Sequence, residues 1–239
     1  MSPGVFLTAE WRDLVLINFE VHPSLLAPFI PPGTELDCFE GRAFLSLVGF
    51  RFLETRVFGL RVPFHTNFLE INLRTYVRRM HLGELRRGVV FIREIVPRRA
   101  IAFMARAFYN ENYIALPMSH TFSEWDGGNR TIAYGWRGFA HDGEMSLTID
   151  GPAELPRAGS HGQFIIDHFW GYTTQRDGTS MEYRVEHAPW PLSPGRNLSF
   201  NGNPDLVYGP ELGAVLRGAP VSGFFTAGSA VTVMRGQRI

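Results

Sequence analysis

Polar and apolar residues alternate along the stretch from Phe68 to Arg78, and this alternation constrains the fold more than any other feature. Successive side chains of a β-strand point to opposite faces, so the pattern predicts a strand with one apolar face against a core. The other face meets either solvent or a polar cavity. Its side chains are Glu70, Asn72, Arg74, Tyr76 and Arg78.

A second strand is predicted at residues 88–96, a run rich in β-branched residues that Arg93 and Glu94 interrupt. The segment before it, residues 81–88, contains two glycines and predicts a turn. We therefore expect this strand to pair antiparallel with strand 68–79.

Pro97 ends the second strand and predicts the first turn of a helix, because proline lacks a backbone N–H and its fixed φ suits that position. Apolar residues then recur at i, i+3, i+4 and i+7, which is typical of an amphipathic helix. We expect this helix, residues 98–109, to be the longest of the chain. Its apolar stripe consists of Ile101, Met104, Ala105 and Phe108.

Arg98 and Arg99 fall in the first turn of that helix, where a cation is unfavourable by roughly 0.3–1 kcal/mol. Two explanations stay open. The corner binds an anion, such as a substrate carboxylate, through these arginines and backbone N–H groups. Alternatively, both arginines are solvated and pair with a nearby carboxylate such as Glu94 or Glu111.

The rest of the chain reads as short strands, turns and a few short helices. Residues 55–67 predict an irregular loop, and residues 193–220 predict a loop with one short helix at 205–216. Other short helices are expected at 23–33 and 162–171. Strands are expected at 14–21, in a hairpin with arms 36–39 and 43–54, in a meander of 118–125, 130–137 and 144–151, and at 181–187, 221–225 and 230–234.

The composition excludes one class of chemistry. All 23 basic residues are arginine, so the chain has no lysine amine to form a Schiff base with a substrate carbonyl or with pyridoxal phosphate. The net charge is zero, so we expect no nucleic-acid partner. No apolar run has the length of a membrane span, no signal peptide is evident, and Cys38 is the sole cysteine. These features favour one cytoplasmic domain, residues 1–239.

The eight histidines show no spacing of a compact metal site, and no nucleotide-binding or nucleophile motif occurs. We therefore expect neither a metal nor a cofactor. His187, in the run His-Ala-Pro-Trp-Pro, is interpreted as part of a turn beside a buried tryptophan, with a catalytic base as the second interpretation.

Several runs together resemble the uncharacterised bacterial YqjF-like family (domain of unknown function 2071). They cover nearly the whole chain. The runs are Trp11 to Val21, Pro31 to Asp37, Ser46 to Phe50, Phe68-x-Glu70-x-Asn72-x-Arg74-x-Tyr76, and Val185-x-His187-x-Pro189-Trp190-Pro191-Leu192.

That family is similar in fold to acetoacetate decarboxylases, and the resemblance implies a mostly β (α+β) fold. The expected architecture is an antiparallel, barrel-like sheet with an internal pocket and a few peripheral helices. In the decarboxylases, Arg-Glu is followed by Gly-Phe-Pro-Lys-Lys. Here Arg93-Glu94 and Pro97-Arg98-Arg99 resemble that run, without the Gly-Phe and with arginine for both lysines. Glu70, on the preceding strand, resembles the glutamate in the pocket of the decarboxylases.

The resemblance implies a pocket for a small organic carboxylate or carbonyl compound, in a protein without the Schiff-base lysine. The alternative is an enzyme on such a compound that forms no imine, with Glu70 or Glu94 as acid or base and arginines as electrostatic clamps. We expect a small-molecule ligand and no membrane partner, and a homo-oligomer stays open. The residues expected to contact the ligand are Asn72, Arg74, Tyr76, Arg93, Arg98 and Arg99.

Overall fold

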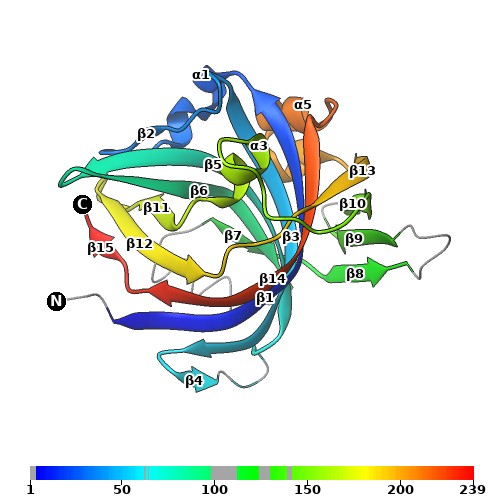
Figure 1. Cartoon of the computed structure of the whole chain (residues 1–239), viewed down its shortest axis with the longest axis horizontal. Coiled ribbons are helices and arrows are strands. Elements are labelled where there is room, and N and C mark those ends of the chain that lie inside the picture. The colour runs from blue at the N-terminus through cyan, green and yellow to red at the C-terminus, as the bar shows by residue number, and fades with distance from the viewer. Residues whose placement is uncertain (1–3, 62, 64, 98–111, 124–129, 139–141) are drawn as a thin grey trace.

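The computed structural model describes residues 4–61, 63, 65–97, 112–123, 130–138 and 142–239. Seven strands pair in a ring in the order β1, β3, β5, β6, β11, β12 and β14, and β14 pairs again with β1 (Figure 1). Their bounds are β1 Val5–Val21, β3 Ala43–Val57, β5 Phe68–His81, β6 Glu84–Val96, β11 Trp170–Thr174, β12 Ser180–His187 and β14 Ser222–Met234.

All pairs in this ring are antiparallel except β6 with β11. That parallel contact is short, because it joins only Trp170 with Gly88 and Gly171 with Val89. A Cβ on Gly88 would lie 2.5 Å from the Trp170 carbonyl oxygen, so the two backbones approach too closely for any side chain there. The predicted mostly β, barrel-like fold is confirmed, with this narrow contact helping to complete the ring.

A meander extends the sheet from β14 and packs on the outer face of the ring. It consists of β13 Ser193–Asn201, β10 Gly143–Ile149, β9 Arg130–Trp136 and β8 Met118–Phe122, in that order from β14. The remaining strands are short: β2 Glu35–Leu36, β4 Leu60–Arg61, β7 Tyr113–Ala115 and β15 Gln237–Arg238. They pair with β5, β3, β6 and β12 respectively.

In the described part of the chain, five short helical segments lie around the sheet (Figure 1). Two of them follow β1, α3 precedes β11, and α4 and α5 precede β14. The helix predicted at 98–109 lies outside the described residues. Along the described residues, no helix has the length and apolar character needed to cross a bilayer. The segments are α1 Pro23–Leu26, η1 Ala27–Phe29, α3 His161–Ile166, α4 Pro204–Tyr208 and α5 Pro210–Leu216.

The two largest apolar cores among the described residues lie on the two faces of the ring. The outer core, between the ring, the meander and helices α4 and α5, includes Ile71 and Leu73 of β5. The inner core includes Phe50 of β3 and Phe164 of α3. Because β5 has apolar residues on its outer face, its polar residues point inward. The alternation predicted at residues 68–78 thus places polar side chains inside the ring.

Five element predictions need correction. The helix predicted at 162–171 ends at Ile166, and Trp170 and Gly171 belong to β11. The expected hairpin of 36–39 with 43–54 is reduced to one bridge between Phe39 and Arg42, because β2 pairs with β5 instead. The 55–67 loop contains the end of β3 and β4, joined by a tight turn. Phe58 and Gly59 in that turn both have positive φ, as a type I′ hairpin turn requires.

The other two corrections concern the C-terminal part. Residues 193–201 form β13, although their proline and glycine content predicted a loop. Strands 221–225 and 230–234 are one strand, β14, with Gly228 at φ +74° in its middle. A Cβ on Gly228 would lie 2.0 Å from the Trp11 carbonyl oxygen. Glycine therefore allows the strand to continue where the sequence indicated a break.

Candidate functional site

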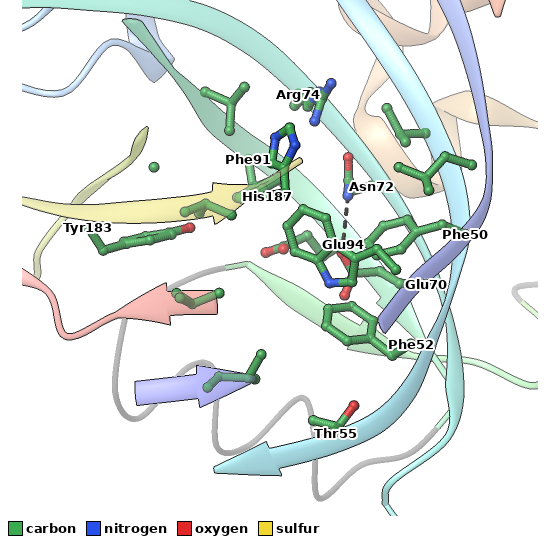
Figure 2. Close-up of a pocket in the computed structure, with 18 of the residues that line it drawn as sticks. Phe50, Phe52, Thr55, Glu70, Asn72, Arg74, Phe91, Glu94, Tyr183 and His187 are labelled. Atoms are coloured by element: carbon green, nitrogen blue, oxygen red, sulfur yellow. Dashed lines mark hydrogen bonds between the residues drawn. The ribbon is translucent and has the colours of Figure 1, made fainter. Parts of the chain in front are cut away.

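A cavity of about 200 Å³ lies inside the ring (Figure 2). A cavity of this size has room for several water molecules, so it suits a small molecule. Most of its wall is apolar, and the aromatic rings contact one another, with Trp11 and Phe50 at a centroid distance of 5.3 Å. The aromatic lining includes Trp11, Phe50, Phe52, Phe91, Tyr183 and Trp190.

A polar strip crosses this apolar wall. Strand β5 contributes Glu70, Asn72 and Arg74 at every second position, so all three share the inner face. Strand β6 contributes Glu94, whose Cα is paired with that of Asn72. Glu70 and Glu94 are only 3% and 1% exposed. In Figure 2 the two carboxylate side chains and Asn72 lie together in the middle of the site.

A β-bulge in β6 turns Glu94 toward the cavity. Leu73 pairs with Arg93, whereas the next residue, Arg74, pairs with Phe91, so one residue of β6 is extra. The extra residue shifts by one position which residues of β6 point inward. Phe91 and Glu94 therefore both line the cavity.

Asn112 holds the bulged segment by two hydrogen bonds. Its Nδ2 donates to the Ile92 carbonyl at 3.2 Å, and its own carbonyl accepts from the Glu94 amide at 3.2 Å. The segment before β7 thus supplies partners for the backbone of the bulge.

The Glu70 carboxylate is held at both oxygens. Asn72 Nδ2 donates to Oε1 at 3.1 Å, and the Tyr113 hydroxyl donates to Oε2 at 3.1 Å (Figure 2 shows the first bond). Tyr113 belongs to β7, which pairs with β6 next to Glu94. Two donors on one carboxylate fix its orientation.

Arg74 places a cation at one end of the cavity. Its Nη2 donates to the Ile165 carbonyl, 3.3 Å away at the end of α3, and its guanidinium lies 5.7 Å from the Tyr76 ring centroid. Within the described part of the chain, Arg74 forms no ion pair, and its buried Nε has no hydrogen-bond partner. A guanidinium with free N–H groups has the chemistry to bind a carboxylate.

Two histidines line the cavity near this arginine. His168 Nε2 lies 3.2 Å from Asp37 Oδ2, which also accepts from Arg87 Nε at 2.6 Å. Burial lowers the pKa of His168 to about 4; the charges of Arg87 and Arg74 act in the same direction, and Asp37 opposes them. Burial tends to raise the pKa of Asp37, but the bonds from His168 and Arg87 outweigh it and the pKa is lowered.

His187 lies at the same end of the cavity as Arg74 (Figure 2). Its Nδ1 is 2.8 Å from the Ala188 carbonyl, and its ring stacks on Trp190 at a centroid distance of 3.9 Å. A carbonyl can only accept, so Nδ1 has the proton and Nε2 is the basic nitrogen of the neutral ring. Burial lowers the pKa of His187, and Arg74 lowers it further.

The structure brings together four of the eight residues predicted for the site. Glu70, Asn72, Arg74 and Glu94 line the cavity. Arg93 does not line it, contrary to the prediction, because the bulge gives the inward position to Glu94.

Tyr76 is buried beside the cavity rather than in its lining, also contrary to the prediction. Its hydroxyl bonds Ser46 Oγ at 2.5 Å. Arg98 and Arg99 lie outside the described residues. Whether the four lining residues act on a ligand stays a prediction.

His168 was not among the residues predicted for the site. It falls within the helix predicted at 162–171, and no motif marks it; in the structure it lies between α3 and β11. His187 was noted, but as part of a turn, and its stacking on Trp190 fits that interpretation while its place in the lining adds a second role. Among the described residues, no group of three metal-binding side chains converges.

Comparisons with known proteins agree with this architecture. The family described as DUF2071, an uncharacterized conserved protein, matches residues 8–226. The uncharacterized protein YqjF of Bacillus subtilis (strain 168) is 31% identical over 196 residues, which cover 79% of this chain and 76% of that protein.

Solved structures with the same fold are more distant in sequence. The acetoacetate decarboxylase of Legionella pneumophila has a TM-score of 0.68 at 13% identity, covering 100% of this chain and 88% of its own. An acetoacetate decarboxylase-like enzyme of Sphingomonas wittichii RW1 has a TM-score of 0.65 at 12% identity, with coverage of 98% and 92%. The enduracididine biosynthesis enzyme MppR, complexed with pyruvate, has a TM-score of 0.65 at 16% identity, with coverage of 100% and 91%.

Proposed function

The chain belongs to the DUF2071 family, and we propose that its cavity binds a small organic carboxylate or carbonyl compound without forming an imine. The observation that supports this most directly is Arg74, a cation in an apolar cavity that forms no ion pair within the described part of the chain. An anionic ligand group would provide the missing partner. The apolar walls would take the rest of the ligand.

The fold neighbours support the ligand class. MppR was solved with pyruvate, and the Legionella protein is an acetoacetate decarboxylase, so both proteins are associated with small oxo acids. The absence of lysine separates this chain from imine chemistry, because no side-chain amine is present to attack a carbonyl. Binding through charge and hydrogen bonds is the route that the residues allow.

A matched ligand pair tests the proposal. Phenylacetate and phenylacetamide have nearly the same shape and differ in charge. We expect the purified protein to bind phenylacetate at least about tenfold more tightly by isothermal titration calorimetry, because a charge-assisted bond to Arg74 adds about 1.5–3 kcal/mol. Equal affinities would reject an anion site in this cavity.

An enzyme that moves a proton on such a compound is the second candidate. It is favoured by two buried carboxylates, Glu70 and Glu94, in an otherwise apolar cavity, with Arg74 as the electrostatic clamp. Proton abstraction next to a carbonyl would exchange that proton with solvent. Proton NMR of pyruvate or acetoacetate in heavy water would detect the exchange above the rate without protein, and Glu70→Gln or Glu94→Gln should abolish it.

A further inference from the structure

We propose that the cavity selects carboxylates that also present a hydroxyl or amine hydrogen, and that it discriminates against the corresponding oxo acids. This inference rests on the proposed function and narrows its ligand class. It follows from three polar atoms of the cavity lining that have no hydrogen-bond partner among the described residues: one cationic donor and two neutral acceptors. They belong to Arg74, Asn72 and His168. Trp11 Nε1 and Thr55 Oγ1, also on lining residues, likewise lack a partner within that part of the chain.

Arg74 provides the donor for the carboxylate. Its guanidinium offers five N–H groups in one plane, and the Ile165 carbonyl accepts from Nη2. The Nε group is buried without a partner among the described residues. A carboxylate binds Nε and one Nη together in the bidentate arrangement that suits this geometry.

Asn72 provides the first acceptor. The Glu70 carboxylate accepts from its side chain at 3.1 Å, so the amide nitrogen faces Glu70 and the oxygen must point elsewhere. Asn72 is only 2% exposed, and its Oδ1 has no hydrogen-bond partner in the described part of the chain. Asn72 and Arg74 are two residues apart on β5 and share the inner face.

His168 provides the second acceptor. Asp37 accepts from Nε2, and Arg87 keeps that carboxylate ionised, so the Nε2–H tautomer is fixed. The neutral ring then has its lone pair on Nδ1, which is buried and lacks a partner among the described residues. The charge of Arg74 acts on His168, and the Tyr76 ring contacts both side chains, so the acceptor is close to the anion site.

A ligand that satisfies all three groups must have an anionic acceptor and a hydrogen-bond donor. The carboxylate meets Arg74, and an adjacent O–H or N–H donates to Asn72 Oδ1 or His168 Nδ1. An oxo group has lone pairs only, so it cannot donate to either acceptor. Its oxygen would also repel the acceptor that it faces. Sites built to hydrogen-bond a hydroxyl reject analogues that lack it far more strongly than apolar pockets reject a missing methylene.

Mandelate and phenylglyoxylate test the inference, since they share the ring, the carboxylate and the number of non-hydrogen atoms. One has a hydroxyl and the other an oxo group next to the carboxylate. We expect calorimetry to show at least about tenfold tighter binding of one mandelate enantiomer than of phenylglyoxylate. In Asn72→Leu, which removes the acceptor at similar volume, this preference for mandelate over phenylglyoxylate should shrink.

The outcomes separate the two proposals. Equal or tighter binding of phenylglyoxylate in the wild type would overturn the inference, and if both ligands still bind better than phenylacetamide, the anion site stands. Failure of both acids to bind better than phenylacetamide would overturn the proposed function and this inference with it. The wild-type comparison needs no variant, so a folding defect in Asn72→Leu cannot obscure the result.

Discussion

Phe91 and Glu94 lie three residues apart on β6, and both side chains line the same cavity. A regular strand would place them on opposite faces, since side chains alternate. The one-residue shift between Leu73 and Arg74 in the pairing with β6 removes that conflict. Bulges occur preferentially next to functional sites, where they redirect a side chain. The cavity thereby gains a buried carboxylate beside Asn72.

Asn112→Ala should weaken this bulge. The variant loses the bond from Nδ2 to the Ile92 carbonyl, so we expect a loss of about 0.5–1.5 kcal/mol in the free energy of unfolding by urea denaturation. Asn201→Ala, at the exposed end of β13, is the control and should leave this free energy unchanged. Wild-type behaviour of Asn112→Ala would show that the pairing of β5 with β6 holds the bulge unaided.

Arg74→Gln should weaken carboxylate binding by about tenfold or more. The change removes the charge and keeps a side chain of similar length, so the loss of a charge-assisted bond of about 1.5–3 kcal/mol is measured directly by calorimetry with phenylacetate. Arg78→Gln is the matched control, because Arg78 is on the same strand and pairs with Glu35 at the surface. Equal affinity in the two variants would remove the anion role from Arg74.

The protein should form no imine with acetoacetate. Borohydride treatment in the presence of acetoacetate should leave the intact mass unchanged, because reduction traps an adduct only where an amine has attacked the carbonyl. The α-amino group of Met1, with an ordinary pKa of about 8, is the one amine that the sequence offers. A reduced adduct at Met1 would show recruitment of the terminus, and one at any internal residue would contradict the prediction.

Stability should decrease as the pH falls from about 7 to about 5. The folded protein holds His168 neutral, with its pKa lowered from 6.5 to about 4. Over that window the unfolded chain binds the additional proton, so the free energy of unfolding decreases on acidification. The full effect of His168 is on the order of 3 kcal/mol.

His168→Gln isolates this contribution, because other histidines with lowered pKa values titrate in the same window and glutamine does not titrate. Urea denaturation at several pH values should show a smaller decrease in the variant than in the wild type. Parallel curves would mean that His168 binds protons equally in both states.

Gly88→Ala should destabilise the ring at its parallel contact. The new Cβ would lie 2.5 Å from the Trp170 carbonyl oxygen, a backbone atom that cannot move aside without separating β6 from β11. We expect a loss of about 1–3 kcal/mol in the free energy of unfolding, as for other overpacked sites. Gly4→Ala, where the nearest atom is 3.6 Å away on the Arg235 side chain, should change little. Full stability of Gly88→Ala would mean that this contact is looser than described.

The local sequence was sufficient to predict the strand pair and its polar face. Alternation along Phe68–His81 is a property of one strand, so the inward direction of Glu70, Asn72 and Arg74 follows once the apolar face is buried. The absence of lysine likewise excluded an imine on a side-chain amine. The family resemblance supplied the ring-like architecture, which short strands and turns alone do not specify.

Other features depended on the tertiary structure. The bulge in β6 exchanges Arg93 for Glu94 at the cavity, and it arises from the pairing register with β5 and from bonds to Asn112, which is distant in sequence. His168 becomes part of the site because Asp37, 131 residues earlier, bonds its Nε2. Periodicity within a segment determines which face a side chain takes. Only long-range contacts decide which segments meet, and therefore which polar atoms lie together inside the ring.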